Sequence, residues 1–221
     1  LASGLKPAIL SRGYGNRTGT GIRRIRFCET GDADASAFGD EPCILARGNP
    51  EVPVYVSSSR IDASRLAIER DQADLLILDD AFQHLAIKRD LNLLLVDALK
   101  GFGNGRLIPL GELREPLSAM ERADAVLVTR SSLGDADAVI RILREELKMN
   151  CPVFRFDYRP RRLVRLDGRE EKDPTLLEGL KVLLTSGIAG PEGFSAVIRG
   201  LGGKPVEELV FEDHHPYPDS T

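Results

Sequence analysis

The sequence is poor in the features that hold small secreted or membrane-spanning proteins in place. Its three cysteines, Cys28, Cys43 and Cys151, are odd in number and widely spaced, which gives neither a disulfide framework nor a CxxC metal pair. No apolar run approaches the roughly 20 residues that a membrane-spanning helix needs. Acidic residues outnumber basic ones by 34 to 30, which disfavours nucleic-acid binding through a globally basic surface. These absences favour a globular protein of a reducing compartment.

A chain of 221 residues is long enough for about one and a half domains and needs no disulfide or metal to bury a core. It begins with Leu1 rather than methionine, and its last residues, PYPDST, complete no predicted element. We therefore expect the chain to be part of a longer protein.

Short continuous runs of leucine, isoleucine and valine recur along the chain, which is typical of strands covered on both faces in a parallel sheet. Amphipathic helical patterns fall between some of them, most clearly at 135–148, where Asp135 supplies a helix start. This alternation predicts an α/β fold with a mostly parallel sheet. The predicted strands are 8–10, 52–56, 75–78, 91–96, 125–128, 181–185 and 206–211.

The composition changes after about residue 158. Residues 159–173 are dense in charge, and a strand, a helix at 192–199 and a further strand are predicted after them. We therefore expect a core domain over residues 1–158 and the start of a smaller C-terminal α/β lobe over 159–221.

Ligands of parallel sheets bind at the carboxyl ends of the strands, and the sharpest polar motif lies at such an end. LLIL at 75–78 precedes Asp79 and Asp80, as in a Walker B strand, whose carboxylate serves a hard Mg²⁺ ion. An acidic loop after a buried strand explains this pattern about as well. Gln83 and His84, which follow at the same strand end, favour a site.

Weaker motifs stand elsewhere along the chain: SRGYG at 11–15, directly after a predicted strand, GDEP at 39–42, and GFGNGR at 101–106 with LREP at 113–116. Taken singly, the first three are explained by a strand-to-loop turn, an Asx turn at Asp40 and a flexible connector. Near the C-terminus, Asp213 stands beside His214, and a carboxylate there can fix the tautomer of the imidazole and raise its basicity.

The chain contains no GxxxxGK[ST] phosphate-binding loop, and its one Gly-Lys pair, at 203–204, is followed by proline. A Walker B strand without that loop is half a nucleotide site. Because the loop normally follows the first strand of such a domain, we expect it upstream of Leu1.

Taken together and in this order, the motifs resemble the tetraacyldisaccharide 4'-kinase family, enzymes that phosphorylate the lipid A precursor of Gram-negative bacteria. The family's SRGYG, GDEP, DDGFQH, GFGNG, LREP and DH elements appear at 11–15, 39–42, 79–84, 101–105, 113–116 and 213–214, and its GIxxPexF stretch is similar to 188–194. Ala81 departs from a usual glycine and Glu112 from a usual proline. The resemblance implies that this chain is the middle of a longer enzyme.

The resemblance further implies a P-loop NTPase-like fold and transfer of a phosphoryl group from ATP, with Mg²⁺, to the 4'-hydroxyl of a tetraacyldisaccharide 1-phosphate. The partners that it implies are the lipid A disaccharide precursor and, at the cytoplasmic face of the bacterial inner membrane, the membrane surface, with no nucleic acid. The roles that it implies are catalysis for Asp40 and His214, metal binding for Asp79, Asp80 and Glu115, and substrate or phosphate binding for Arg60, Gln83, His84 and Arg114.

Two other functions are open to the same residues. The first is a P-loop-class regulatory ATPase without a small-molecule acceptor, against which the Asp40–His214 pair argues, because a switch protein needs no base for a sugar hydroxyl. The second is a domain that binds acidic lipid headgroups through 159–169. That run grades into Glu170 and Glu171, which is more typical of a solvated surface.

Overall fold

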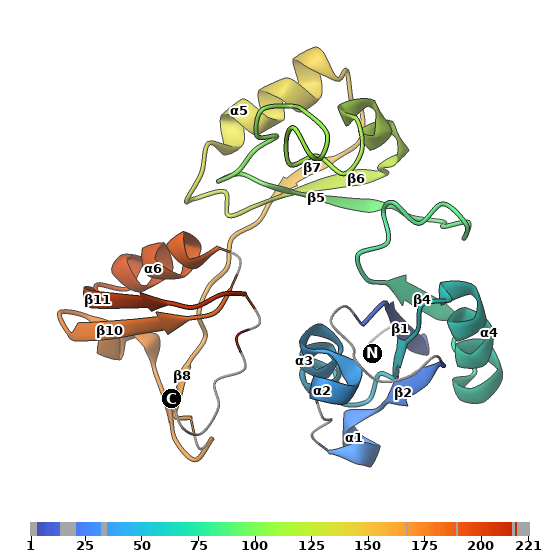
Figure 1. Cartoon of the computed structure of the whole chain (residues 1–221), viewed down its shortest axis with the longest axis horizontal. Coiled ribbons are helices and arrows are strands. Elements are labelled where there is room, and N and C mark those ends of the chain that lie inside the picture. The colour runs from blue at the N-terminus through green and yellow to red at the C-terminus, as the bar shows by residue number, and fades with distance from the viewer. Residues whose placement is uncertain are drawn as a thin grey trace. The chain divides into compact units, whose positions relative to one another are not determined.

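The computed structural model describes residues 4–13, 21–31, 35–166, 168–188, 190–213 and 215. The chain divides into two compact units, Leu1–Asn92 (unit 1) and Leu93–Thr221 (unit 2) (Figure 1). Within the described part of the chain, no helix is both long enough and apolar enough to cross a membrane.

Unit 1 is built on a four-stranded sheet with the order β2-β3-β1-β4, in which only β2 runs antiparallel to its neighbour. Its strands are β1 (Pro7–Ser11), β2 (Arg23–Ile25), β3 (Val54–Val56) and β4 (Leu75–Leu78). Its helices are α1 (Phe27–Thr30), α2 (Ala35–Phe38), α3 (Asp40–Gly48) and α4 (Arg60–Asp71).

Alternation along β1 divides the core of unit 1 between the two faces of the sheet. Ala8 and Leu10 belong to a buried cluster with Ala63 and Ala67 of α4, whose small side chains let the helix approach closely. Ile9 belongs to the opposite cluster, which includes Ala46 of α3. Helices on both faces are what a sheet of continuous apolar strands requires.

Unit 2 contains a parallel sheet with the order β5-β6-β7 and a parallel pair, β10-β11, that is connected through α6 (Pro191–Gly200) (Figure 1). The strands are β5 (Leu93–Asp97), β6 (Ala125–Thr129), β7 (Val153–Arg155), β10 (Lys181–Ser186) and β11 (Lys204–Val210). The remaining elements are η1 (Leu117–Arg122), α5 (Ala136–Arg141), the π-helical turn η2 (Ile142–Glu146), the antiparallel β8 (Leu163–Val164) and β9 (Glu171–Lys172), and η3 (Pro174–Leu177).

The predicted α/β class and its parallel sheets are confirmed. Strand β4 has the predicted bounds, and Asp135 caps α5 by accepting a hydrogen bond from the Ala138 N–H at 2.8 Å. The division into units lies between Asn92 and Leu93, inside the domain predicted over 1–158. The boundary predicted near residue 158 falls within unit 2, just after β7, where the chain leaves the parallel sheet.

Candidate functional site

The acidic pair predicted as a Walker B motif stands at the carboxyl end of β4, beside the end of β1. The N–H of Asp79 donates to the carbonyl of Leu10 at 2.9 Å. The hydroxyl of Ser11 donates to Oδ2 of Asp79 at 3.1 Å. Asp80 is exposed and has a positive φ of 42°, which is uncommon for a residue with a side chain. The neighbouring strand ends therefore bring a carboxylate and a hydroxyl together.

Arg60, the first residue of α4, lies close to the acidic pair and is only 4% exposed. Its Nη2 donates to the main-chain carbonyls of Asp79 at 2.6 Å and Asp80 at 3.1 Å. Burial, and then the neighbouring charge of Arg12, lower the pKa of Arg60 from its usual value, but an arginine remains protonated in a protein. The predicted substrate-binding residue thus places a fixed cation against the backbone of the acidic loop.

Arg89 is a second cation that contacts this loop, and no motif in the sequence pointed to it. Its Nη1 donates to the carbonyls of Ala81, at 3.3 Å, and of His84. Its Nε donates to Oδ1 of Asn92. An isolated arginine five residues after a histidine has no recognisable pattern, because its partners are main-chain oxygens that any residue supplies.

Ala81 occupies the position where the family usually has glycine, and the structure accommodates it. It is 5% exposed, and its φ is not positive. Its carbonyl accepts the N–H of His84 at 2.9 Å. The backbone at this point therefore does not require a glycine.

His84 turns its imidazole into the same region, whereas Gln83 is exposed. The Nε2 atom of His84 is buried and has no hydrogen-bond partner among the described residues. Burial, followed by the charges of Arg60, Arg89 and Arg12, lowers the pKa of His84, so the imidazole is neutral at neutral pH. A neutral imidazole can donate or accept a single hydrogen bond with a ligand.

Asp40 is not the turn residue that the isolated GDEP motif suggests. It is the exposed first residue of α3, after Gly39, which is the N-cap with a φ of 93°. A carboxylate in the first turn is favoured by the helix dipole. His214, its predicted partner, lies outside the described residues, so the Asp40–His214 pair stays a prediction. The neighbouring His215 stacks on Phe211 with ring centroids 4.6 Å apart.

The GFGNG loop of unit 2 is built from tight turns rather than being a loose connector. Gly101, Gly103 and Gly105 all have positive φ values, between 56° and 70°, which glycine adopts without strain. Asn104 ties the loop to the segment that follows, since its Nδ2 donates to the carbonyl of Leu110 at 2.8 Å and its Oδ1 accepts from the Arg106 N–H at 3.0 Å.

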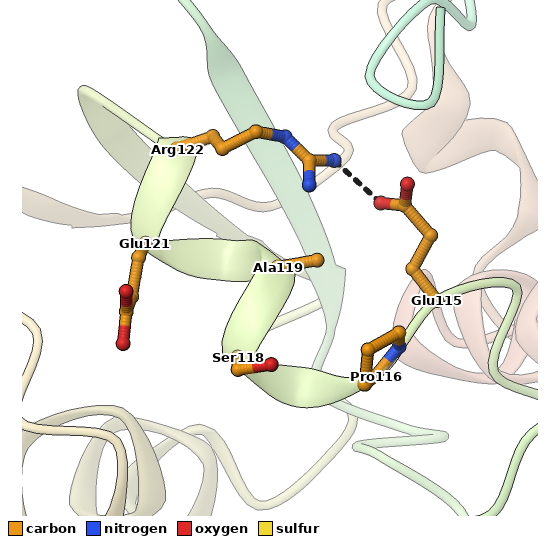
Figure 2. Close-up of a pocket in the computed structure, with 6 residues that line it drawn as sticks. All are labelled: Glu115, Pro116, Ser118, Ala119, Glu121 and Arg122. Atoms are coloured by element: carbon orange, nitrogen blue, oxygen red, sulfur yellow. Dashed lines mark hydrogen bonds and ion pairs between the residues drawn. The ribbon is translucent and has the colours of Figure 1, made fainter. Parts of the chain in front are cut away.

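In the LREP motif of unit 2, Glu115 forms an ion pair with Arg122 at the end of η1 (Figure 2). The two residues line an open hollow of about 550 Å³ together with Ser118 and Glu121. Arg114 is exposed. Because Arg122 already compensates the charge of Glu115, a metal ion would have to compete with the guanidinium for this carboxylate.

The oxygen atoms of Asp79, Asp80 and Ser11 provide some, but not all, of the ligands that a hard cation such as Mg²⁺ needs. No group of three histidine, cysteine or acidic side chains that could enclose a metal ion is found among the described residues. Asp79, Asp80 and Ser11 nevertheless offer oxygen atoms at one strand end, and Mg²⁺ is usually held by one or two carboxylates while it keeps several waters. Glu115 belongs to unit 2, so its predicted role with this pair stays a prediction.

A parallel α/β sheet with an acidic pair at a strand end and a buried cation beneath it defines a domain of the P-loop kinase-like class. The chain belongs to the tetraacyldisaccharide-1-P 4'-kinase family, whose model matches residues 1–221.

Named relatives and a solved structure agree with this assignment. The chain is 39% identical to the tetraacyldisaccharide 4'-kinase of Syntrophus aciditrophicus and 37% identical to that of Geobacter sulfurreducens, over 98% of its own length and 60% and 59% of theirs. It superposes with a TM-score of 0.74 and 32% identity on "apo" form LpxK from Aquifex aeolicus in complex with ATP, over 100% of this chain and 66% of that one. The chain thus spans about 60% of the length of these curated relatives.

Proposed function

We propose that the full-length protein transfers the γ-phosphoryl group of ATP to the 4'-hydroxyl of a tetraacyldisaccharide 1-phosphate. The observation that carries this proposal is the end of β4, where Asp79 is hydrogen-bonded to Ser11 and Arg60 lies against the same loop. The names of the relatives and the ATP in the Aquifex aeolicus structure supply the reaction and the donor.

Phosphoryl transfer depends on positioning and on neutralisation of charge more than on covalent chemistry. Asp79 and Asp80 would hold Mg²⁺, and that ion supplies charge compensation at the phosphoryl group when it is bound. Arg60 and Arg89 hold the carbonyls of the loop that carries both carboxylates. The carboxylates are therefore positioned before any ligand arrives, which lowers the cost of binding one.

Asp40 is the group that we assign to the acceptor, as the base that takes the proton of the 4'-hydroxyl, with His214 as its partner. Exposure of Asp40 at the start of α3 leaves the carboxylate accessible to a substrate. Gln83, His84 and Arg114 would bind the sugar or its phosphate, and the buried neutral imidazole of His84 suits an uncharged hydroxyl. Glu115 would help to bind the metal ion once its ion pair with Arg122 is broken.

The acceptor also suggests where the protein works. A tetraacylated disaccharide resides in a membrane because of its acyl chains, so an enzyme that acts on it must reach the membrane surface. We accordingly propose peripheral association with the cytoplasmic face of the bacterial inner membrane, where ATP is available.

The test is transfer of labelled γ-phosphate from ATP to the purified lipid acceptor by the full-length protein, in wild type, Asp40→Ala, His214→Ala and the double variant. General-base assistance is worth roughly 10²–10⁴-fold, and groups that act as a unit are strongly non-additive. We expect kcat to fall by roughly 10²–10⁴-fold in each single variant. The double variant should have a kcat only slightly lower than that of either single variant. ATP hydrolysis without transfer to the acceptor would instead support a regulatory ATPase.

A further inference from the structure

An exposed apolar loop in unit 2 has no part in the chemistry described above. It follows the GFGNG turns, between β5 and η1 (Figure 1). Leu107, Ile108 and Leu110 are all exposed, and the exposed fractions of Ile108 and Leu110 reach 63% and 71%. With Pro109, which is exposed as well, they form a run of four apolar residues, the 107–110 loop. Single exposed leucines are ordinary on a protein surface, whereas contiguous exposed apolar surface marks an interaction site.

The backbone of the 107–110 loop is hydrogen-bonded within the loop and to the residues beside it. The N–H groups of Leu110 and Gly111 donate to the carbonyl of Leu107, at 2.9 and 3.0 Å. The N–H of Ile108 donates to the carbonyl of Leu113 at 3.0 Å, and a proline has no N–H to satisfy. Because these main-chain donors already have partners, moving the loop into a medium without water costs less free energy.

Asn104 of the GFGNG motif fixes the shape of the loop. Its Nδ2 donates to the carbonyl of Leu110 at 2.8 Å, and its Oδ1 accepts the N–H of Arg106 at 3.0 Å. A Cβ on Gly111 would stand 2.2 Å from Oδ1 of Asn104 and 2.3 Å from the carbonyl oxygen of Arg106, so these groups are closely packed. A loop that is held in this way loses little conformational entropy when it binds a partner.

Basic side chains flank the apolar loop. The segment 100–114 contains three basic residues, Lys100, Arg106 and Arg114, and one acidic residue, Glu112. All four are exposed. An apolar tip with a mainly cationic border is complementary to a bilayer that contains anionic lipids, because apolar side chains reach the acyl boundary while basic groups stay among the headgroups.

We propose that the 107–110 loop inserts into the surface of an anionic lipid bilayer. Ile108 and Leu110 would then lie at the level of the acyl chains, and Arg106 among the headgroups. This inference rests on the proposed function, whose acceptor is held in a membrane by its acyl chains, and it names the part of unit 2 that meets that membrane. It also gives the GFGNG motif a role, which is to present the loop in a fixed conformation.

The first test is flotation of the full-length protein with vesicles of phosphatidylethanolamine and phosphatidylglycerol, without ATP. Ile108→Ser combined with Leu110→Ser should weaken vesicle binding roughly tenfold or more, because burial of a single large aliphatic side chain already contributes about this factor. Leu166→Ser combined with Leu176→Ser is the matched control, since both leucines are exposed in unit 2 outside the loop, and it should bind as wild type. Circular dichroism checks that both proteins are folded.

The second test locates the loop relative to the bilayer. The 221 residues contain no tryptophan, so the fluorescence of an introduced indole can be measured against wild type. In Leu110→Trp, the emission should shift to the blue when vesicles are added, and lipids brominated on their acyl chains should quench it. Leu166→Trp should show neither effect. Asn104→Ala, which removes the hydrogen bond to the carbonyl of Leu110 but keeps every apolar side chain, should weaken vesicle binding several-fold.

Wild-type vesicle binding by the Ile108→Ser, Leu110→Ser protein would overturn the inference, and so would equal quenching of Leu110→Trp and Leu166→Trp. An indole at position 110 that is shielded before vesicles are added, and unchanged by them, would overturn it as well, because another part of the full-length protein would then cover the loop. A protein that inserts the loop but phosphorylates no lipid would refute the proposed function and leave this membrane contact standing. An active kinase whose loop stays outside the bilayer would refute this inference alone.

Discussion

The two strand-end loops that carry the family motifs are stabilised in different ways. In unit 1, four carbonyls of the loop after β4 accept hydrogen bonds from two guanidinium groups, Arg60 and Arg89. In unit 2, the loop after β5 uses three glycines with positive φ and the side chain of Asn104. One loop is ordered by charged side chains from elsewhere in its unit, and the other mainly by its own backbone and amide.

The difference matches the chemistry expected of each loop. The buried guanidinium of Arg60 and the half-buried one of Arg89 place positive charge on the loop that carries Asp79 and Asp80. Hydrogen bonds from charged donors are stronger than those from neutral donors. The loop after β5, which is built from glycine turns, brings no such charge, so its contribution is the conformation of its backbone. Electrostatic changes should therefore matter most in unit 1 and steric changes in unit 2.

The largest effect is expected for Asp79→Asn in the full-length protein. Loss of the carboxylate removes the group assigned to the metal, and kcat should fall by roughly 10³-fold, within the range of a lost electrostatic stabiliser. Glu115→Gln, which removes a carboxylate already paired with Arg122, should cost only about tenfold. Initial rates at saturating Mg²⁺, with circular dichroism as the folding control, measure both. An Asp79→Asn rate within a few-fold of wild type would contradict the metal assignment.

The next largest effect is expected on the stability of unit 2, when a side chain is added at Gly134. A Cβ on Gly134 would stand 2.2 Å from the main-chain carbon and oxygen of Ala98, directly after β5. Gly134→Ala should lower the free energy of unfolding by about 3 kcal/mol, at the upper end of overpacking costs. Chemical denaturation of the 221-residue chain measures it. Gly48→Ala, with open space around the new methyl group, should leave stability unchanged or slightly raised, and equal losses in both variants would refute the steric argument.

The carboxylate of Asp71 in unit 1 should make the free energy of unfolding depend on pH. The hydrogen bond from Arg24, and then that from Tyr55, lowers the pKa of Asp71, against the opposing effect of burial. The ionised Asp71 therefore contributes stability above its unfolded pKa of 3.8, and this contribution is lost as the pH falls through the lower folded value. Asp71→Asn should reduce the free energy of unfolding by about 2 kcal/mol at pH 7.

Comparison of wild type with Asp71→Asn at a second pH tests whether the ionised form of Asp71 is the stabilising one. The difference in unfolding free energy between wild type and Asp71→Asn should shrink when denaturation is repeated at pH 3. A difference that grows on acidification would show that the carboxylate is not stabilised in its ionised form. Burial, and then the hydrogen bond to Asp71, raise the pKa of Tyr55 to about 12, so the phenol stays neutral in this window.

The smallest effect is expected for Arg89→Gln. Removing the guanidinium removes its hydrogen bonds to the carbonyls of Ala81 and His84, so the acidic loop is less well positioned. We expect kcat/KM to fall about tenfold, equivalent to 1.4 kcal/mol, and the Mg²⁺ concentration for half-maximal rate to rise. Arg89→Lys should not rescue it, because an ammonium lacks the planar fork. Lys88→Gln, at the exposed neighbouring position, is the control and should behave as wild type; matching losses in the two variants would refute a positioning role.

Local patterns in the sequence determined the class of fold and several of its elements. Continuous apolar runs predict parallel strands covered on both faces. β4 is parallel and has the predicted bounds, but the expected burial is wrong for one face, where Leu75 and Ile77 are exposed. The cap of α5 at Asp135 was also predictable, because its partner, the N–H of Ala138, is only three residues away along the chain. The order of the motifs also identified the family, which a single motif could not do.

Tertiary structure alone decided what the charged side chains contact. Arg60, for which substrate or phosphate binding stays a prediction, donates to the carbonyls of Asp79 and Asp80. Arg89 was not predicted at all, and Glu115 is paired with Arg122. The reason is physical: an arginine side chain reaches several ångströms in many directions, and its partners here are main-chain oxygens that carry no residue-specific signature. Only packing, which brings the start of α4 against the end of β4, selects one contact among them.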